Sequence, residues 1–133
     1  MPDSPYTVLV VEDEPWIRLA MTEHLQGCGV AVLQAASASE AVETLERVPD
    51  VDLVFTDLRL PGARDGIALA RWIAKKLPGI PVMVTSGELG SVRELSELCR
   101  AEGFTSFGKP YAHAEVSARI LELIEARRHR GAP

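Results

Sequence analysis

The segment VLVVEDEP, residues 8–15, places four apolar residues directly before three acidic residues and a proline. A short apolar run of this kind is typical of a buried strand. Carboxylates that lie close together repel each other, and removing them from water costs several kcal/mol per ion unless something compensates. Glu12, Asp13 and Glu14 therefore either cap a helix in solvent or surround a cation, and the rest of the chain decides between these interpretations.

Similar apolar runs alternate with amphipathic stretches along the whole chain. They predict strands at residues 7–11, 31–35, 53–56, 82–85 and 105–107. Apolar residues recur at helical spacing between them, and Pro15, SASE at 37–40 and SVRE at 91–94 are typical of helix starts. Five strands alternating with five helices predict an α/β fold, a doubly wound parallel sheet with right-handed crossovers and helices on both faces.

Length and composition fit one domain. The 133 residues are 47% hydrophobic and 25% charged, the usual mix for a soluble globular protein. The net charge of −5 argues against a general affinity for nucleic acid or anionic membranes. No apolar run approaches the roughly 20 residues that span a bilayer, so we expect a cytoplasmic protein without membrane insertion. Cys28 and Cys99 lack metal-like spacing and are predicted to be reduced thiols of the core.

The domain is predicted to cover residues 1–133, with a core at about 7–126 and a basic tail at 127–133. Arg127, Arg128 and Arg130 in that tail are expected to form a frayed, solvated helix end, where cations suit the helix dipole. Contact with an acidic partner is the alternative interpretation of these arginines.

Chemically reactive residues collect at the predicted ends of the strands. In a parallel α/β sheet, ligands bind beyond the carboxyl ends of the strands, which share one edge. That edge receives Glu12 and Asp13 after the first strand, Asp57 after the third, Thr85 after the fourth and Lys109 after the fifth. Each residue alone has an ordinary explanation as a cap, strand or turn residue, but their joint occurrence in this order predicts a site. The second strand ends in ASAS, so we expect it at the margin of the sheet.

The residue types at that edge suit phosphoryl chemistry. Mg²⁺ prefers a few carboxylate oxygens together with water and phosphate oxygens. Glu12 and Asp13 can hold the ion directly or through water, and Asp57 can supply a third oxygen. The Asp57 carboxylate can then attack a phosphoryl group and become an aspartyl phosphate. Lys109 can pair with one phosphoryl oxygen, and the Thr85 hydroxyl can donate to another.

The motifs VVEDE, TDLRLPG…DG, VMVTSG and GKP, in this order over about residues 7–126, closely resemble the receiver domain of bacterial two-component response regulators, of the stand-alone, single-domain type. The resemblance implies a flavodoxin-like (βα)5 fold with strand order 2-1-3-4-5. It also implies site roles: Asp57 as phospho-acceptor, Glu12 and Asp13 as the acidic Mg²⁺ pair, the backbone carbonyl of Arg59 as a further metal ligand, Thr85 as the switch hydroxyl and Lys109 as the phosphate-pairing lysine.

The resemblance further implies a phosphorylation-dependent switch. A histidine kinase or a histidine phosphotransfer protein would donate the phosphoryl group to Asp57. The face formed by the fourth helix, fifth strand and fifth helix, at about residues 91–126, would then contact a downstream protein target, or the domain would serve in a phosphorelay. Seven residues follow position 126, too few for an output domain unless the chain is a fragment of a larger regulator or hybrid kinase. Whether two copies form a homodimer stays open.

Three other functions compete with this one. A phosphatase acting on external substrates needs an acid two residues after its nucleophile, where this chain has Arg59. We therefore expect no enzyme, only self-phosphorylation and self-dephosphorylation at Asp57. An FMN-binding protein is excluded because EDEP would repel a phosphate. The third alternative is a receiver-like module that takes no phosphate and only binds partners.

Three features depart from the family's pattern or leave alternatives open. The loop LRLPGARDG is one residue longer than the commonest form, and Ser106 stands three residues before the lysine, where the family usually places an aromatic residue. Phe107 either takes that role or packs in the core. Trp16 either docks a kinase or covers the start of the first helix.

Overall fold

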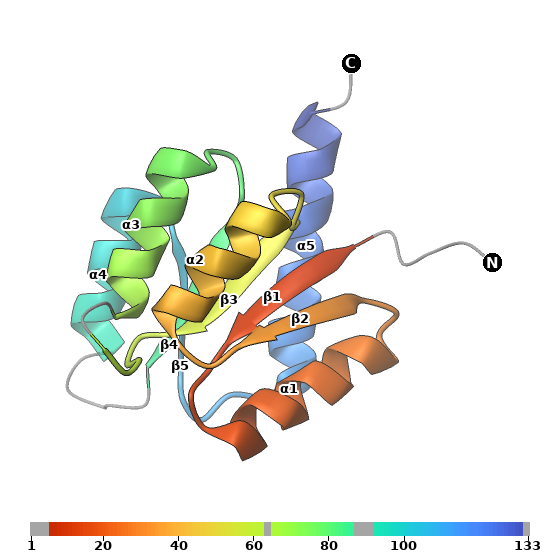
Figure 1. The fold of residues 1–133 in the computed structure, drawn as a ribbon, viewed down its shortest axis with the longest axis horizontal. Coiled ribbons are helices and arrows are strands. Elements are labelled where there is room, and N and C mark those ends of the chain that lie inside the picture. Colours follow the sequence, from red (N-terminus) through yellow and green to blue (C-terminus); the bar gives the residue numbers. More distant parts are fainter. Residues whose placement is uncertain (1–5, 63–64, 87–91, 132–133) are drawn as a thin grey trace.

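The computed structural model describes residues 6–62, 65–86 and 92–131, and these form a single parallel sheet flanked by helices (Figure 1). The strands are β1 (Thr7–Val11), β2 (Ala31–Ala35), β3 (Leu53–Asp57), β4 (Val82–Ser86) and β5 (Thr105–Gly108). The helices are α1 (Pro15–Gly27), α2 (Ala38–Arg47), α3 (Gly66–Lys76), α4 (Val92–Glu102) and α5 (His113–Gly131). The sheet order is β2-β1-β3-β4-β5, which confirms the predicted fold and places β2 at a margin.

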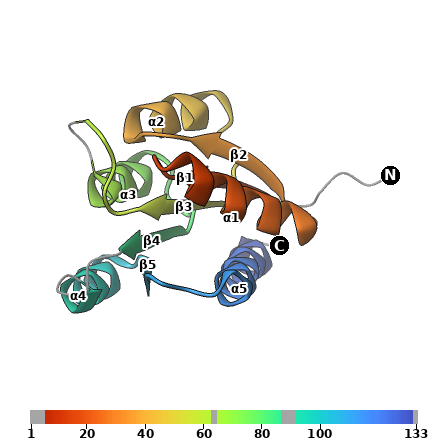
Figure 2. The same cartoon turned by 90° about the horizontal axis from the view of Figure 1, so that it is seen from below.

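Helices cover both faces of the sheet, with α2, α3 and α4 on one side and α1 and α5 on the other (Figure 2). Alternate residues of β1 enter the two clusters: Leu9 and Val11 pack toward α2 and α3, whereas Val8 and Val10 pack toward α1 and α5. Burial on both faces is why the strands are almost continuously apolar in the sequence.

The helix starts follow from local chemistry. Pro15 opens α1, where its missing N–H removes no helical hydrogen bond. At α2, the Ser37 hydroxyl accepts from the Glu40 N–H at 3.1 Å, and the Glu40 carboxylate accepts from the Ala36 N–H at 2.9 Å. The capping box predicted at 91–94 begins outside the described residues.

The predicted burial is confirmed for Cys99 and wrong for Cys28. Cys99 is buried in the cluster beneath α4, but Cys28 is exposed. Cys28 follows the last residue of α1 as its C-cap, where the chain has already left the face that buries Met21 and Leu25. Helical spacing alone did not show that the helix ends before this position.

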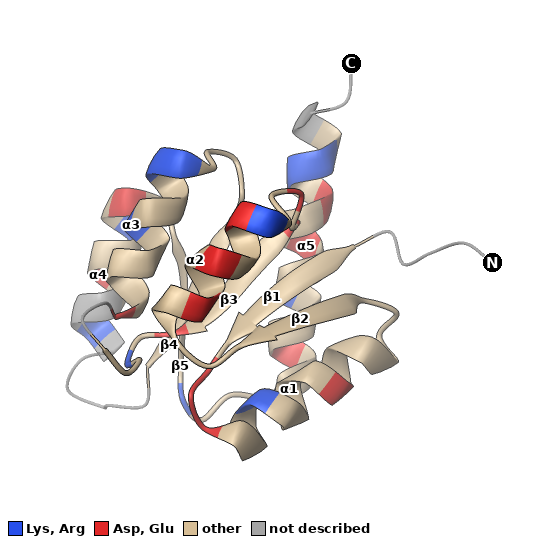
Figure 3. Ribbon diagram, in the orientation of Figure 1, with Lys and Arg blue, Asp and Glu red and all other residues tan. Residues whose placement is uncertain are grey.

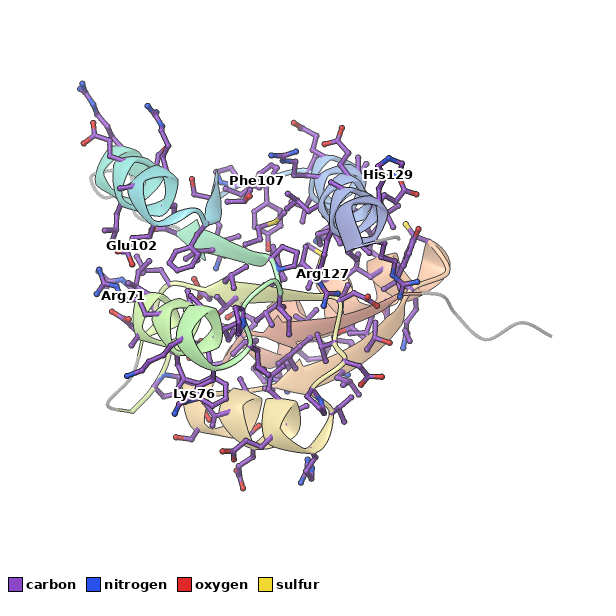
Figure 4. All side chains as sticks on the ribbon, turned by 90° about the horizontal axis from the view of Figure 1, so that it is seen from above. Arg71, Lys76, Glu102, Phe107, Arg127 and His129 are labelled. Carbon is purple, nitrogen blue, oxygen red and sulfur yellow. The ribbon has the colours of Figure 1, made fainter. Side chains whose placement is uncertain are left out.

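The arginines of the predicted tail also need correction. The α5 helix continues to Gly131, and Arg128 forms two short hydrogen bonds to Asp52, at 2.9 and 3.0 Å. Arg128 Nε adds a longer one at 3.2 Å and Arg127 another contact at 3.4 Å, and Figure 4 shows the position of Arg127 on α5. Asp52 is buried at the amino end of the sheet and also accepts from the Thr7 N–H at 2.8 Å. Arg127 and Arg128 are therefore anchors and not a solvated end; the side chain of Arg130 lies outside the description.

In the part of the chain that is described, none of the helices combines the length and apolar character needed to cross a bilayer.

Candidate functional site

The carboxyl ends of four strands bring the predicted residues together. Glu12 follows β1, Asp57 ends β3, and Lys109 follows β5. Thr85 lies on β4 in register with Asp57 and is almost fully buried. Figure 3 shows the acidic turn after β1 at the same edge as the basic position after β5. These four residues thus lie at one edge of the sheet, as predicted from the parallel topology.

Three carboxylates form a compact oxygen cluster. One oxygen each from Glu12, Asp13 and Asp57 lies within 4.8 Å of the other two. Glu12 and Asp57 are buried, whereas Asp13 is exposed to solvent. Ligands in a Mg²⁺ octahedron lie about 3 Å apart when adjacent and about 4 Å when opposite, so these oxygens can reach one ion directly or through water. An all-oxygen donor set also suits Mg²⁺ better than zinc or copper. The Arg59 carbonyl as a further ligand stays a prediction.

Lys109 lies against two of these carboxylates. Its Nζ atom is 3.2 Å from Asp57 Oδ2 and 3.4 Å from Glu12 Oε1. Burial alone would lower the pKa of Lys109, but the negative charges of Asp57 and Glu12 outweigh it and leave the pKa raised. The ammonium is therefore charged at neutral pH and available to an anionic group bound at Asp57. The backbone N–H of Lys109 also donates to the Ser86 carbonyl at 2.7 Å, which fixes the chain after β5 to the end of β4.

The pKa of Glu12 is raised, which indicates that positive charge near this carboxylate is insufficient. Burial raises the pKa of its carboxyl, and the nearby charge of Asp57 raises it further. The Glu14 N–H, at 3.1 Å from Glu12 Oε2, and Lys109 act in the opposite direction but do not cancel the effect. An added cation would remove this deficit, so the cluster fits a metal ion better than a role as a helix cap.

Backbone packing below Asp57 explains the DG motif. A Cβ atom on Gly66 would collide with the Asp57 carbonyl oxygen and would lie 2.9 Å from Leu58 Cα. The Gly66 N–H donates to the Leu58 carbonyl at 2.7 Å, so the start of α3 rests directly on the end of β3. Glycine is required here for close approach and not for an unusual backbone angle.

Two residues that sequence reasoning missed also shape the site. Arg18 donates from Nη1 to the Glu12 carbonyl at 2.8 Å and from Nε to Gln34 at 3.2 Å, which fixes the acidic turn. The Tyr111 ring packs edge-to-face on Phe55, with centroids 6.1 Å apart. Burial raises the pKa of Tyr111, while Lys109 lowers it and Glu12 raises it. Neither residue has a signal in the sequence, because both act through contacts between elements.

The structure shows on which face of the sheet Phe107 and Ser106 lie. Phe107 packs into the cluster under α1 and α5, and it is in register with Thr85. Ser106 is in register with Val84, whose side chain belongs to the opposite cluster. Phe107 therefore packs on the face that α1 and α5 cover, and Ser106 occupies the position three residues before Lys109. A switch role for Phe107 stays a prediction.

A groove of about 500 Å³ begins at Lys109 and runs between α1 and the start of α5. It is lined mainly by apolar and aromatic side chains: Trp16, Ile17, Ala20, Lys109, Pro110, Tyr111 and His113. Trp16 is 79% exposed, and Ile17 and Leu19 beside it on α1 are also exposed. Trp16 therefore does not pack over the helix start, which was one of its two interpretations.

Comparison with known proteins agrees with this fold and site. The family model for the response regulator receiver domain matches residues 8–121. A response regulator receiver protein of Anaeromyxobacter sp. (strain Fw109-5) is 35% identical over 119 residues, which are 88% of this chain and 45% of that protein. The sensor kinase CckA of Brucella abortus (strain 2308) is 34% identical over 122 residues, 90% of this chain and 12% of the kinase. A solved receiver domain protein from Clostridium thermocellum has a TM-score of 0.85 at 26% identity, covering 92% of this chain and 97% of its own.

Because the family model matches most of its length, the chain belongs to the response regulator receiver domain family of two-component systems. Members of this family interact with histidine kinases and downstream effectors. The chain spans less than half the length of the two curated relatives named above.

Proposed function

We propose that this receiver domain is a phosphorylation-dependent switch in which Asp57 accepts a phosphoryl group from a histidine kinase or a histidine phosphotransfer protein. The observation that supports it best is the position of Lys109 Nζ, 3.2 Å from Asp57 Oδ2 and beside the three clustered carboxylates. A phosphoryl group adds about −1.5 to −2 charge at this edge. That charge would alter the α4–β5–α5 face, which would contact a downstream protein or serve a phosphorelay.

In the proposed transfer, an oxygen of Asp57 attacks phosphorus, the P–N bond of the phosphohistidine breaks, and its electron pair stays with the imidazole. Mg²⁺ held by Glu12, Asp13 and Asp57 would supply positive charge to the phosphoryl oxygens. The Lys109 ammonium exchanges its carboxylate contact for one of those oxygens, and the Thr85 hydroxyl donates to another. We propose no reaction on external substrates, because Arg59 stands where a hydrolase would need an acid.

The groove beside Lys109 is the proposed docking surface for the phosphodonor. Exposed aromatic side chains are enriched among residues that dominate binding energy, and Trp16 lies where the groove opens toward solvent. Trp16→Ala is expected to slow transfer from a phosphohistidine protein by about tenfold or more. Phosphorylation by acetyl phosphate, which needs no docking, should not change. Trp72→Phe, on α3, is the matched control and should leave both rates unchanged.

Mass measurement tests the acceptor directly. Incubation with Mg²⁺ and acetyl phosphate is expected to add the mass of one phosphoryl group to the intact chain. The gain should disappear in Asp57→Asn and persist in Asp50→Asn, which alters an exposed aspartate on the connection before β3. No gain in the unaltered protein would instead favour the phosphorylation-inert module that only binds partners.

A second candidate concerns the setting of the domain and not its chemistry. The relatives described above are much longer than this chain, and one of them is a sensor kinase. This favours the alternative that the domain works as part of a larger regulator or hybrid kinase, with its partner surfaces facing other domains of the same protein. Transfer from a kinase core supplied as a separate protein, compared with one fused to this chain, would distinguish the two settings.

A further inference from the structure

We infer that the end of α1 and the start of α5 form a metal site separate from the acidic cluster, in which His24 and Cys28 bind a thiophilic divalent cation such as Zn²⁺. The chain contains two cysteines and three histidines, and three of these five residues, His24, Cys28 and His113, lie together at this place. The inference goes beyond the proposed function, because it requires no phosphoryl group at Asp57 and none of its residues is in the acidic cluster.

The imidazole of His24 and the thiol of Cys28 face each other, with His24 Nε2 at 4.0 Å from Cys28 Sγ. Zn²⁺ binds nitrogen and thiolate sulfur at about 2.0–2.3 Å, so two such ligands in a tetrahedron lie roughly 3.5 Å apart. A small rotation of the exposed Cys28 side chain closes the difference. The spacing of four residues places the two side chains on one side of the helix, as in the paired ligands of helical zinc sites.

The turn after α1 fixes the backbone of Cys28. Its N–H donates to the Leu25 carbonyl at 2.9 Å. The Val30 N–H donates to the same carbonyl at 3.1 Å, and the Val30 side chain is buried. The thiol of Cys28 is nevertheless exposed, so an ion from solution can reach it.

Ser117 of α5 brings an oxygen atom to the same imidazole nitrogen. Its Oγ lies 3.0 Å from His24 Nε2, and the residue is 5% exposed. The single proton of the Ser117 hydroxyl is donated to the Ala114 carbonyl at 3.1 Å, so the oxygen lone pairs are left for the contact with His24. A cation that replaces the imidazole proton in this contact therefore meets a nitrogen, a sulfur and an oxygen donor.

His113 orients the imidazole of His24. The two rings stack with centroids 5.4 Å apart and planes 28° from parallel. Contacts that orient a histidine ligand typically change metal affinity by about 10–100-fold. His113 is therefore a positioning residue and not a ligand. Because His113 also lines the groove beside Lys109, a bound ion would restrain one wall of that groove through the stacked rings.

The two clusters favour different ions. The acidic cluster offers only oxygen atoms, which suit Mg²⁺, whereas sulfur and imidazole nitrogen suit Zn²⁺. Binding requires the thiolate form of Cys28, so the thiol proton passes to the buffer, and no oxidant or reductant takes part. An excess of Mg²⁺ can therefore occupy the acidic cluster without competing for the thiolate.

Cobalt titration of the reduced protein tests the inference. Co²⁺ accepts the same nitrogen and sulfur ligands as Zn²⁺, and a bound thiolate gives it a charge-transfer absorption band. With Mg²⁺ in excess, we expect this band to saturate at one Co²⁺ per chain and to be lost when Zn²⁺ displaces the cobalt. Absence of the band while both thiols are reduced would overturn the inference.

Variants with matched controls identify the ligands. Cys28→Ser should abolish the band, and His24→Gln should weaken Co²⁺ binding by about tenfold or more. Cys99→Ala removes the buried thiol, and His129→Gln removes an exposed imidazole near the other end of α5 (Figure 4). Both controls should keep the band and the affinity. A band that persists in Cys28→Ser, or an affinity that His24→Gln leaves unchanged, would contradict the site.

A conservative pair tests the positioning role of His113. His113→Ala should weaken Co²⁺ binding, and His113→Phe, which keeps a ring stacked on His24, should restore most of the affinity. Equal losses in the two variants would contradict a role through stacking.

Hydrogen–deuterium exchange locates the ion independently of absorption. With Mg²⁺ in excess, Zn²⁺ should slow amide exchange in residues 24–30 by on the order of threefold or more. Slowing confined to residues 12–15 would place the ion in the acidic cluster and overturn the inference. The Asp57→Asn variant should respond in the same way as the unaltered protein, so failure of this inference and failure of the proposed function give different results.

Discussion

The two ends of the sheet both contain buried carboxylates, but they differ in how many cationic groups face those carboxylates. At the amino end, Asp52 accepts hydrogen bonds from Arg127, Arg128 and the Thr7 N–H, so two guanidinium groups face one carboxylate. At the carboxyl end, Glu12, Asp13 and Asp57 form a cluster of three carboxylates. The ammonium of Lys109 forms ion pairs with two of them, Glu12 and Asp57. Burial is similar at the two ends, since Asp52 and Glu12 are each 4% exposed.

This difference shows that a buried acid is not in itself a sign of function. Asp52 is compensated by the chain and holds α5 against the sheet. Glu12 is compensated less completely, because burial and the charge of Asp57 raise its pKa more than the Glu14 N–H and Lys109 lower it. A site that leaves buried negative charge under-compensated is prepared for a cation from solution.

The largest expected effect separates the two ends by their response to Mg²⁺. At a concentration of one hundred times its dissociation constant, Mg²⁺ should stabilise the protein by about 2.7 kcal/mol. The Glu12→Gln, Asp13→Asn double variant should lose this stabilisation, while Asp52→Asn should retain it. Urea unfolding with and without Mg²⁺ measures the difference. Equal Mg²⁺ stabilisation in both variants would contradict the assignment of the acidic cluster.

The next largest effect concerns the amino end of the sheet, where Arg128 contacts Asp52. Arg128→Met removes the two short hydrogen bonds to Asp52 and should cost about 1–2 kcal/mol of stability, allowing for the partial exposure of Arg128. Arg119→Met, which disrupts an exposed pair with Glu122 on the same helix, is the control and should have little effect. Phosphorylation by acetyl phosphate should stay intact in both. A loss of phosphorylation in Arg128→Met would show that the two ends are coupled.

A pH series sharpens the contrast at Glu12. Because its pKa is raised above 4.5 in the folded protein, protons compete with Mg²⁺ as the pH falls through that raised pKa, by up to about tenfold in affinity per pH unit. Without metal, the folded state binds more protons than the unfolded state between these two pKa values, so stability falls as pH rises across that window. Calorimetric titration of Glu12→Gln should show a weaker pH dependence, and an unchanged one would contradict the role of Glu12.

The smallest effect concerns Arg71 and Glu102, which form an ion pair at the surface. The side-chain hydrogen bond from Arg71 lowers the pKa of Glu102, so the pair contributes above the ordinary pKa of a glutamate and is lost as the pH falls through the lowered value. Arg71→Met should therefore reduce the melting temperature less than Arg128→Met. Because salt screens an exposed pair, the loss of melting temperature in Arg71→Met should be smaller still at high salt. A larger loss in Arg71→Met would mean that the tie between α3 and α4 matters more than its exposure suggests.

The fold and the acidic end were largely predictable from the sequence. Strands buried on both faces are continuous apolar runs, and every predicted strand agrees with the structure to within one residue at each end. Parallel topology then places residues that follow different strands at one edge, which brings Glu12, Asp57 and Lys109 together without knowledge of any distance.

The compensated end was not predictable in the same way. Arg128 and Asp52 are 76 residues apart, and no periodic pattern links them. The exposure of Cys28 and Trp16 depends on where α1 ends and how it lies on the sheet, which helical spacing does not specify. The need for glycine at position 66 is visible only when the start of α3 is placed on the Asp57 carbonyl.

The most direct test is to locate the phosphoryl group after incubation with acetyl phosphate. Reduction of the acyl phosphate with borohydride, followed by peptide mapping, should place the modified residue at Asp57. Modification should require Mg²⁺ and should disappear in the Glu12→Gln, Asp13→Asn double variant. Modification of another carboxylate, or equal modification of Asp57 with the metal removed, would contradict the account.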